Sequence, residues 1–308
     1  MPDSLIIPTS ALQAYRRCPK SYELGYVQML DPIVDREAVI EGRGFHEEME
    51  AYAHERRGTV ATDKTGLPKR YVASEAMHDV AVSYIRHKAG AEFDRMTQII
   101  AIEEPLYTRI HPPSGMLPVL NAQWAHLDHR LPDVYVRTTF DLVYQYDDDG
   151  DWIAGRDYKS FERAPSYDLD LDFQGRLYIA TLMQRYKTDR VRFEYENVRR
   201  VPPGTKNSKG VWGPDECYIS YPLVISADEA RRLWREAQYT VAKILQAMAL
   251  GDPAAWERHD LKVGPHSCGS CFWKHLCKAD MHGTLDEQTK QEFANRRDPL
   301  VLPAGMPA

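Results

Sequence analysis

Apolar and polar positions alternate along this chain in patterns that predict a mixture of helices and strands. Apolar side chains at helical spacing predict helices over 10–18, 35–56, 72–90 and 167–186, and a long helix after Ser226. Period-two or continuous apolar runs predict strands at 98–110, 134–144, 152–159, 190–198 and 217–225. The core order is therefore helix, three strands, helix, strand, which predicts one α/β unit with a mixed sheet flanked by helices.

Acidic and basic side chains gather on two of these predicted strands. The polar turn at 147–151 joins the strand of Asp141 to the strand of Asp157 and Lys159, which predicts an antiparallel hairpin. Asp157 and Lys159 are two residues apart and so share one face of their strand. Two carboxylates and an ammonium at one sheet edge suit a divalent cation and an anionic substrate, although such a triplet is also common as a solvated charge pair.

Composition limits the class of protein. The chain has 308 residues, 43% of them apolar, and a formal net charge of −6. No apolar run approaches the roughly twenty residues of a membrane span, and the N-terminus lacks signal-peptide features. We therefore expect a cytoplasmic protein. The negative net charge leaves room for a local basic groove.

The cysteines predict a metal or cluster site. Cys268, Cys271 and Cys277 are closely spaced, and Cys18, at the end of the first predicted helix, is the expected fourth ligand. Spacing alone does not separate zinc from an iron–sulfur cluster, and His266 or His275 could replace Cys18 in a zinc site. Cys217, at a predicted strand start, is expected to be a buried small hydrophobe.

Three further segments carry candidate functional side chains. His46 follows two glycines inside the helix predicted at 35–56, in Gly-Arg-Gly-Phe-His. Gln174 and Tyr178 are four apart and so share one helical face. A basic stretch without periodicity follows the strand at 190–198, and it suits a nucleic-acid strand or a solvated loop equally. The candidates for nucleic-acid contacts are Arg190 and Arg192 on that strand, and Arg199, Arg200, Lys206, Lys209 and Trp212 in the stretch after it.

Six of these features occur in the same order as the motifs of a known family. They are Cys18, the glycine-flanked His46, Asp141, Asp-Tyr-Lys at 157–159, Gln174 with Tyr178, and the three late cysteines. The chain resembles iron–sulfur members of the PD-(D/E)XK nuclease superfamily, the RecB/AddB-like type, and similar CRISPR-associated and phage exonucleases. The resemblance implies a restriction-endonuclease-like core in αβββαβ order. It also favours a 4Fe–4S cluster on Cys18, Cys268, Cys271 and Cys277 over zinc.

The resemblance also implies the role of each matching residue. His46, Asp141, Asp157 and the backbone carbonyl of Tyr158 match metal ligands for Mg²⁺ or Mn²⁺. Lys159 matches the lysine that orients the attacking water, so the catalytic set is Asp141, Asp157 and Lys159. Glu103 or Glu104 matches a further acidic residue, and the sequence leaves open which. The expected DNA contacts are Gln174, Tyr178, Arg199, Arg200 and Trp212.

The expected function is therefore a metal-dependent DNA exonuclease in recombination, repair or CRISPR-type processing. The substrate is expected to be single-stranded DNA or duplex ends. A helicase, recombinase or integrase partner and assembly into a homo-oligomer are both possible on this sequence. A cluster-bearing DNA adaptor with an idle nuclease centre, or a zinc-stabilised module, are the alternatives. We expect residues 1–285 to form one nuclease domain and residues 286–308 to form a disordered tail.

Overall fold

The chain divides into two compact units. The computed structural model describes residues 3–32, 37–62, 67–69, 75–146, 152–161, 172–207, 210–251, 255–256, 268 and 271–296. The terminal unit contains Met1–Asp35, Tyr107–Arg137 and Arg232–Ala308, and the central unit contains Arg36–Leu106 and Thr138–Arg231. The boundaries at 106/107, 137/138 and 231/232 fall inside the elements β4, β5 and α9, whose bounds are given below.

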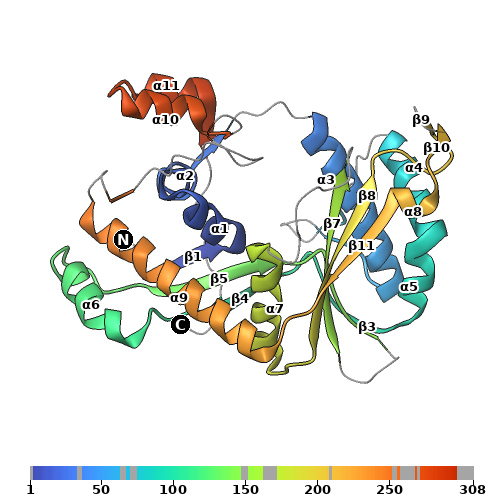
Figure 1. The fold of residues 1–308 in the computed structure, drawn as a ribbon, viewed down its shortest axis with the longest axis horizontal. Coiled ribbons are helices and arrows are strands. Elements are labelled where there is room, and N and C mark those ends of the chain that lie inside the picture. Colours follow the sequence, from blue (N-terminus) through green and yellow to red (C-terminus); the bar gives the residue numbers. More distant parts are fainter. Residues whose placement is uncertain are drawn as a thin grey trace. The chain divides into compact units, whose positions relative to one another are not determined.

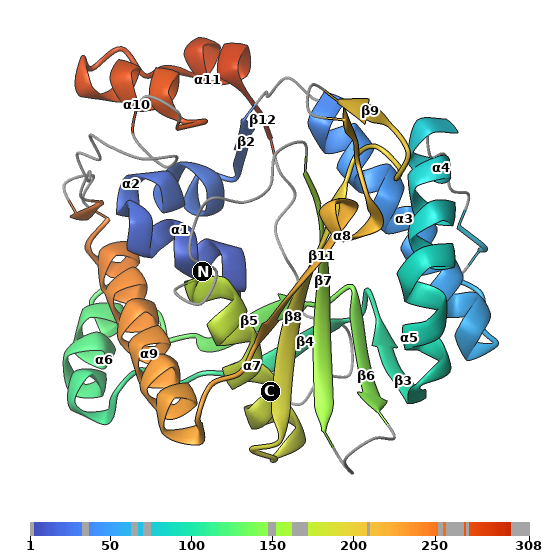
Figure 2. The same ribbon diagram turned by 45° about the vertical axis from the view of Figure 1, so that its right-hand side comes forward.

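The central unit is built on a mixed sheet. Within the described ranges, its strands are hydrogen-bonded in the order β11-β8-β7-β6-β3 (Figure 2). β7 is parallel to β8, and the other neighbouring pairs are antiparallel. The strands are β3 (Met96–Ile102), β6 (Leu142–Tyr146), β7 (Ile153–Phe161), β8 (Val191–Arg199) and β11 (Tyr218–Leu223), with a short hairpin of β9 (Lys206–Asn207) and β10 (Gly210–Val211). The antiparallel β6–β7 pair confirms the predicted hairpin, although its turn at 147–151 lies outside the described residues.

Helices cover both faces of this sheet. They are α3 (Glu37–Arg57), α4 (Glu75–Tyr84), the π-helical turn η2 (Ile85–Ala89), α5 (Gly90–Asp94), α7 (Phe173–Tyr186) and the short α8 (Pro214–Cys217). Phe45 and Met49 of α3 are fully buried in one cluster with Tyr158 of β7, which confirms the predicted apolar stripe of that helix. Gly155 points the other way, because side chains alternate along a strand, and a Cβ there would lie 3.0 Å from Leu182 of α7. The central unit is thus a mixed α/β layer structure in the predicted αβββαβ order.

Two predicted strands are each divided in the structure. The run at 98–110 breaks between β3 and β4 (Pro105–Arg109), and the run at 134–144 breaks between β5 (Asp133–Thr139) and β6. β4 and β5 belong to a different sheet, in which β5 is parallel to β1 (Ser4–Pro8). The segment 105–139 is therefore an insertion between the first and second core strands. Periodicity did not reveal it, because an apolar run looks the same whichever sheet it joins.

The terminal unit joins both ends of the chain. Besides β1, β4 and β5 it contains α1 (Thr9–Arg17), α2 (Pro19–Tyr22), η1 (Glu23–Val27), β2 (Leu30–Pro32), η3 (Ser114–Met116), α6 (Leu117–Ala125), most of α9 (Ala227–Leu250), α10 (Lys274–Met281), α11 (Glu287–Phe293) and β12 (Ala294–Arg296) (Figure 1). The long helix α9 begins as predicted, since the Ser226 hydroxyl accepts a hydrogen bond from Glu229 N at 3.2 Å. The predicted strand start at 214–217 is instead the helical turn α8, although Cys217 is fully buried as expected.

Protein contacts fasten the two ends of the terminal unit together. Lys20 is 2% exposed, and its ammonium lies 2.9 Å from Asp280 and also pairs with Glu23. Trp273 packs so closely on Gly25 that a Cβ there would lie 3.2 Å from the indole. β12 pairs antiparallel with β2, so the prediction of a disordered tail from residue 286 is wrong over 287–296. The remaining residues 297–308 lie outside the described residues. Polar composition alone misled here, because the tail buries Ala294 against Leu24 and Leu30.

Over the described part of the chain, no helix combines the length and the apolarity that a membrane crossing requires.

Candidate functional site

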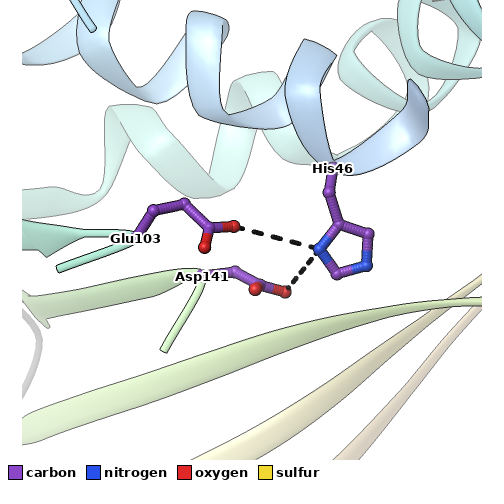
Figure 3. A group of neighbouring side chains, drawn as sticks. All are labelled: His46, Glu103 and Asp141. Carbon is purple, nitrogen blue, oxygen red and sulfur yellow. Dashed lines mark ion pairs between the residues drawn. The ribbon is translucent and has the colours of Figure 1, made fainter. Parts of the chain in front are cut away.

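Three potential ligand atoms converge at one end of the central unit. Nδ1 of His46 lies 3.2 Å from Asp141 Oδ2 and 3.9 Å from Glu103 Oε1 (Figure 3). Among the described residues, this is the one group of histidine, cysteine and acidic side chains whose ligand atoms all lie within 4.8 Å of one another. Two carboxylates and an imidazole form a donor set that suits a divalent metal ion such as Mg²⁺ or Mn²⁺.

Each member of this group lies on or next to a different element: His46 inside a helix, and the two acidic residues at strand ends. His46 follows the buried Phe45 on α3, at the edge of the stripe that packs on the sheet. Glu103 comes directly after β3, and Asp141 directly before β6. The Glu103 backbone has a positive φ of 51°, which is uncommon for a residue with a Cβ, and its N–H donates to Asp141 O at 3.2 Å. Each of the two predicted strands is interrupted next to one of these residues, the first just after β3 and the second just before β6. These interruptions bring Glu103 and Asp141 together.

The structure also decides between the two adjacent glutamates. The Glu104 carboxylate lies 3.4 Å from Arg57 Nη1, with its side chain 60% exposed. It is not part of the group within 4.8 Å, whereas Glu103 is. Glu103 is accordingly the acidic residue that faces the site.

Asp157 and Lys159 extend the site along β7. Asp157 is 5% exposed, and its Oδ2 lies 2.5 Å from the Lys159 ammonium. The Lys159 side chain is 46% exposed, so the cation reaches from a buried carboxylate to solvent. The backbone N–H of Tyr158, between them, donates to Asp141 Oδ2 at 2.5 Å. The predicted residues His46, Asp141, Asp157 and Lys159 are thus brought together, while their roles stay predictions.

The charges of the site shift its pKa values in opposite directions. Burial raises the pKa of Glu103 to about 7, with Asp141 adding to the shift. Burial also raises the pKa of Asp157, because it outweighs the attraction of the nearby Lys159 ammonium, and Asp141 adds to the rise. Asp141 differs, since His46 and the Tyr158 amide overcome burial and lower its pKa. Burial thus disfavours the charged forms of Glu103 and Asp157, and a bound cation would oppose that effect.

The two basic residues respond to the same carboxylates. Desolvation alone would lower the pKa of His46, but Asp141 raises it to about 10. Desolvation likewise opposes the charged form of Lys159, and Asp157 outweighs it, so the Lys159 pKa is raised. Both groups are cationic at neutral pH in the protein alone. Their positive charges offset the same acidic residues whose charge a bound metal ion would neutralise.

Gln174 and Tyr178 lie beside this site rather than on an outer surface. Gln174 Nε2 donates to Tyr178 Oη at 2.7 Å within the first turns of α7. Tyr178 is buried, and its ring packs 4.9 Å from that of Phe140. Burial raises the pKa of the Tyr178 hydroxyl, and the negative charge of Asp157 raises it further. The Tyr178 hydroxyl is therefore near enough to Asp157 to interact with it electrostatically.

The basic residues after β8 have different surroundings. The Arg199 guanidinium lies over the Trp212 ring at 3.8 Å and over the Phe161 ring at 4.8 Å, and the residue is 9% exposed. Arg200 is half-buried, with Nε 3.4 Å from Ser160 Oγ. Arg199 is therefore stacked between two aromatic rings, whereas the printed contact of Arg200 is with a serine hydroxyl. Of the other candidates, Arg192 stacks 4.1 Å over Tyr146, and Lys209 lies outside the described residues.

The four predicted cluster cysteines all belong to the terminal unit, whereas the His46 group belongs to the central unit. Cys18 ends α1, and Cys277 lies on α10. Burial raises the pKa of Cys271, and the thiols of Cys18 and Cys268 raise it further, so these three sulfurs are close enough to interact electrostatically. No three of these four thiols are among the ligand atoms that lie within 4.8 Å of one another in the described residues, so an iron–sulfur cluster or zinc here stays a prediction. His266 lies outside the described residues, and His275 stacks on Phe293 at 4.9 Å.

Two residues beside the site were missed by the sequence analysis. Tyr195 of β8 pairs in register with Asp157, and its hydroxyl donates to Asp172 Oδ2 at 2.5 Å. An aspartate directly before a helix is a recognisable N-cap signal. Nothing in the sequence indicates that a tyrosine some twenty residues later shares that cap, because the pairing depends on the packing of α7 on β8.

Comparison with protein-family models shows the family of this chain. The chain matches the PD-(D/E)XK nuclease superfamily over residues 8–278, and it belongs to that superfamily. The superfamily is one of hydrolytic nucleases whose members typically use divalent metals such as Mg²⁺ or Mn²⁺.

Two solved structures are similar to this chain at low identity. The protein SSO0001 is 11% identical with a TM-score of 0.42, and the match covers 91% of this chain and 88% of that one. A protein from Eubacterium rectale, described as a candidate exonuclease, is 8% identical with a TM-score of 0.43, and the match covers 80% of this chain and 82% of that one. The search of curated proteins gave no match.

Proposed function

We propose that this chain is a divalent-metal-dependent deoxyribonuclease that degrades single-stranded DNA or duplex ends as an exonuclease. The observation that carries the proposal is the convergence of His46, Glu103 and Asp141 within 4.8 Å, beside the Asp157–Lys159 pair. Membership of the nuclease superfamily supports hydrolysis of phosphodiesters. The choice of DNA and of an exonucleolytic mode is part of the proposal.

The ion would be held by His46, Glu103, Asp141, Asp157 and the backbone carbonyl of Tyr158. When bound, a divalent ion offsets the charge of the phosphodiester and lowers the pKa of bound water. Because a ligand imidazole must be neutral, His46 gives up its proton to the solvent on metal binding. Glu103, whose pKa is raised to about 7, would also bind the ion as a carboxylate.

Lys159 and Tyr178 supply polar hydrogens at the mouth of the site. The exposed Lys159 ammonium is anchored on Asp157, from where it can orient the attacking water and offset phosphate charge. The Tyr178 hydroxyl oxygen accepts a hydrogen bond from Gln174, and this bond does not use the hydrogen of the Tyr178 hydroxyl. We propose that this hydrogen and the Gln174 amide contact the DNA strand.

The DNA strand would continue along the basic segment after β8. We propose that Arg200 contacts a phosphate and that Trp212 offers a ring face to a base, with Arg199 holding the other face. The stacking of Arg199 on Trp212 supports this division, since a base and a guanidinium can sandwich one indole.

For the terminal unit we propose a 4Fe–4S cluster of the RecB/AddB type on Cys18, Cys268, Cys271 and Cys277. The electrostatic coupling of Cys18 and Cys268 to Cys271 supports it. Residues 1–285 would then act as one nuclease in recombination, repair or CRISPR-type processing. Partner proteins of the helicase, recombinase or integrase kind, and a homo-oligomer, are compatible with this proposal.

A degradation assay tests the proposed function directly. End-labelled linear single-stranded DNA, circular single-stranded DNA and RNA of the same sequence are incubated with Mg²⁺, Mn²⁺ or EDTA. We expect metal-dependent release of short products from linear DNA, slow cleavage of the circle and little cleavage of RNA. Metal-independent binding without cleavage would instead support an adaptor with an idle centre.

A further inference from the structure

A hydrogen-bonded pair with one buried member lies beside Lys159 but contributes no proposed metal ligand. Tyr195 of β8 is 4% exposed, and its hydroxyl donates to Asp172 Oδ2 at 2.5 Å. The same oxygen accepts a hydrogen bond from Gly175 N at 2.9 Å, which makes Asp172 the N-cap of α7. One carboxylate oxygen therefore ties a core strand to the first turn of a helix.

The Tyr195 ring forms one wall of the space around the Lys159 side chain. The Lys159 ammonium lies 5.9 Å from the centroid of this ring, within the range of a cation–π contact. The ring itself is confined, because Phe193 meets it edge-on at 4.9 Å and a Cβ on Gly175 would lie 3.0 Å from it. A lysine side chain can adopt many rotamers, so a fixed ring narrows the positions that the ammonium can occupy.

The same helix turn carries the other polar group of the site. Gln174 follows the cap by two residues and donates to Tyr178 Oη at 2.7 Å. Loss of the cap would free the first turn of α7, since the N–H of Gly175 would lose its acceptor. The Asp172–Tyr195 pair thus controls both Lys159, through the ring, and Gln174, through the helix turn.

We propose that Tyr195 and Asp172 are positioning residues for phosphodiester hydrolysis by this chain. Tyr195 restrains Lys159, and Asp172 restrains Tyr195 together with the start of α7. Neither residue touches the substrate or the metal ligand atoms, and no bond to them forms or breaks. The proposal rests on the nuclease function proposed above and adds two residues to its machinery.

The alternative is that Asp172 only stabilises a helix, and the chain offers a matched control for that. Ser226 caps α9 with the same kind of bond, to Glu229 N at 3.2 Å, and takes no part in the proposed site. Asp172→Ala and Ser226→Ala should both lower the thermal midpoint, because each removes an N-cap. Only Asp172→Ala should lower kcat.

The measurement is steady-state hydrolysis of a labelled single-stranded oligonucleotide by the full chain at saturating Mn²⁺. We expect kcat to fall about tenfold or more in Asp172→Ala with KM within about threefold of the wild type, because small misplacements of reacting groups are costly. Asp172→Asn should restore kcat to within about threefold, since its amide oxygen can accept both bonds. Tyr195→Phe keeps the ring, so its kcat should fall less than that of Tyr195→Leu. If Tyr195→Leu does not fold, Tyr195→Phe alone is measured.

Equal kcat values for Asp172→Ala and Ser226→Ala would overturn the positioning role. A wild type that hydrolyses nothing would refute the proposed function instead. In that event amide hydrogen exchange tests the positioning role without activity. The backbone amides of residues 156–161 should exchange faster in Asp172→Ala than in Ser226→Ala. Identical exchange in the two variants would again count against the proposal.

Discussion

The carboxylate of Asp141 accepts a hydrogen bond from the backbone N–H of Tyr158 at 2.5 Å. This bond fixes the carboxylate between β6 and β7, next to the residue pair that flanks Tyr158 in the sequence. Because a backbone donor does not change rotamer, Asp141 keeps its orientation toward His46 before any metal binds. The acidic site is therefore organised by the sheet itself, as rigid metal sites require.

Loss of Asp157 or Lys159 is expected to abolish cleavage while DNA binding survives. Asp157→Ala removes a proposed ligand, and Lys159→Ala removes the cation that offsets phosphate charge. Lys290, which pairs with Glu287 at 2.9 Å on α11, provides a control, and Lys290→Ala should cleave at the wild-type rate. Initial rates and gel-shift affinities on the same oligonucleotide check this. Undiminished cleavage by both site variants would sink the site assignment.

The two neighbouring glutamates should behave differently. Glu103→Gln removes a carboxylate from the group around His46, so Mn²⁺ affinity should fall about tenfold or more, or about 1.4 kcal/mol. Glu104→Gln breaks only an exposed pair with Arg57, which is worth little. Titration calorimetry with Mn²⁺ compares the two. Equal losses of affinity would show that Glu103 is not the ligand.

Arg199 and Arg200 should separate stability from DNA affinity. Arg199→Ala deletes the buried stack between Phe161 and Trp212, which is expected to cost roughly 1–2 kcal/mol of unfolding free energy. Arg200→Ala should leave unfolding nearly unchanged and weaken DNA binding with a shallower salt dependence. Urea unfolding and binding at several salt concentrations provide both readouts. The reverse pattern would assign the DNA contact to Arg199.

Cysteine replacement tests the proposed cluster. Protein purified without oxygen should be brown, and serine at Cys18, Cys268, Cys271 or Cys277 should bleach it and lower the thermal midpoint. Cys217→Ser is the matched control, since Cys217 is buried in the central unit: it should destabilise without loss of colour. Absorbance and metal analysis decide between iron and zinc. A colourless wild type with stoichiometric zinc contradicts the cluster.

Local pattern predicted much of the central unit correctly. The stripe of Phe45 and Met49 defined α3, and the polar turn between two strands defined the hairpin that carries Asp141 and Asp157. These features depend on residues close in sequence, where helical and strand periods are written directly into the order of side chains. The six motifs in family order also predicted the superfamily that the match over residues 8–278 establishes.

The tertiary structure decided what local pattern leaves open. Two continuous apolar runs each split between sheets, and the split places Glu103, with its positive φ, beside Asp141. The tail at 287–296 became ordered because β2 offered it a strand partner. The Asp172–Tyr195 bond depends on how α7 packs on β8. Most elements and the candidate chemistry can thus be predicted from the order of residues. Which atoms meet depends on pairing between distant segments, and such pairing leaves no periodic pattern in the sequence.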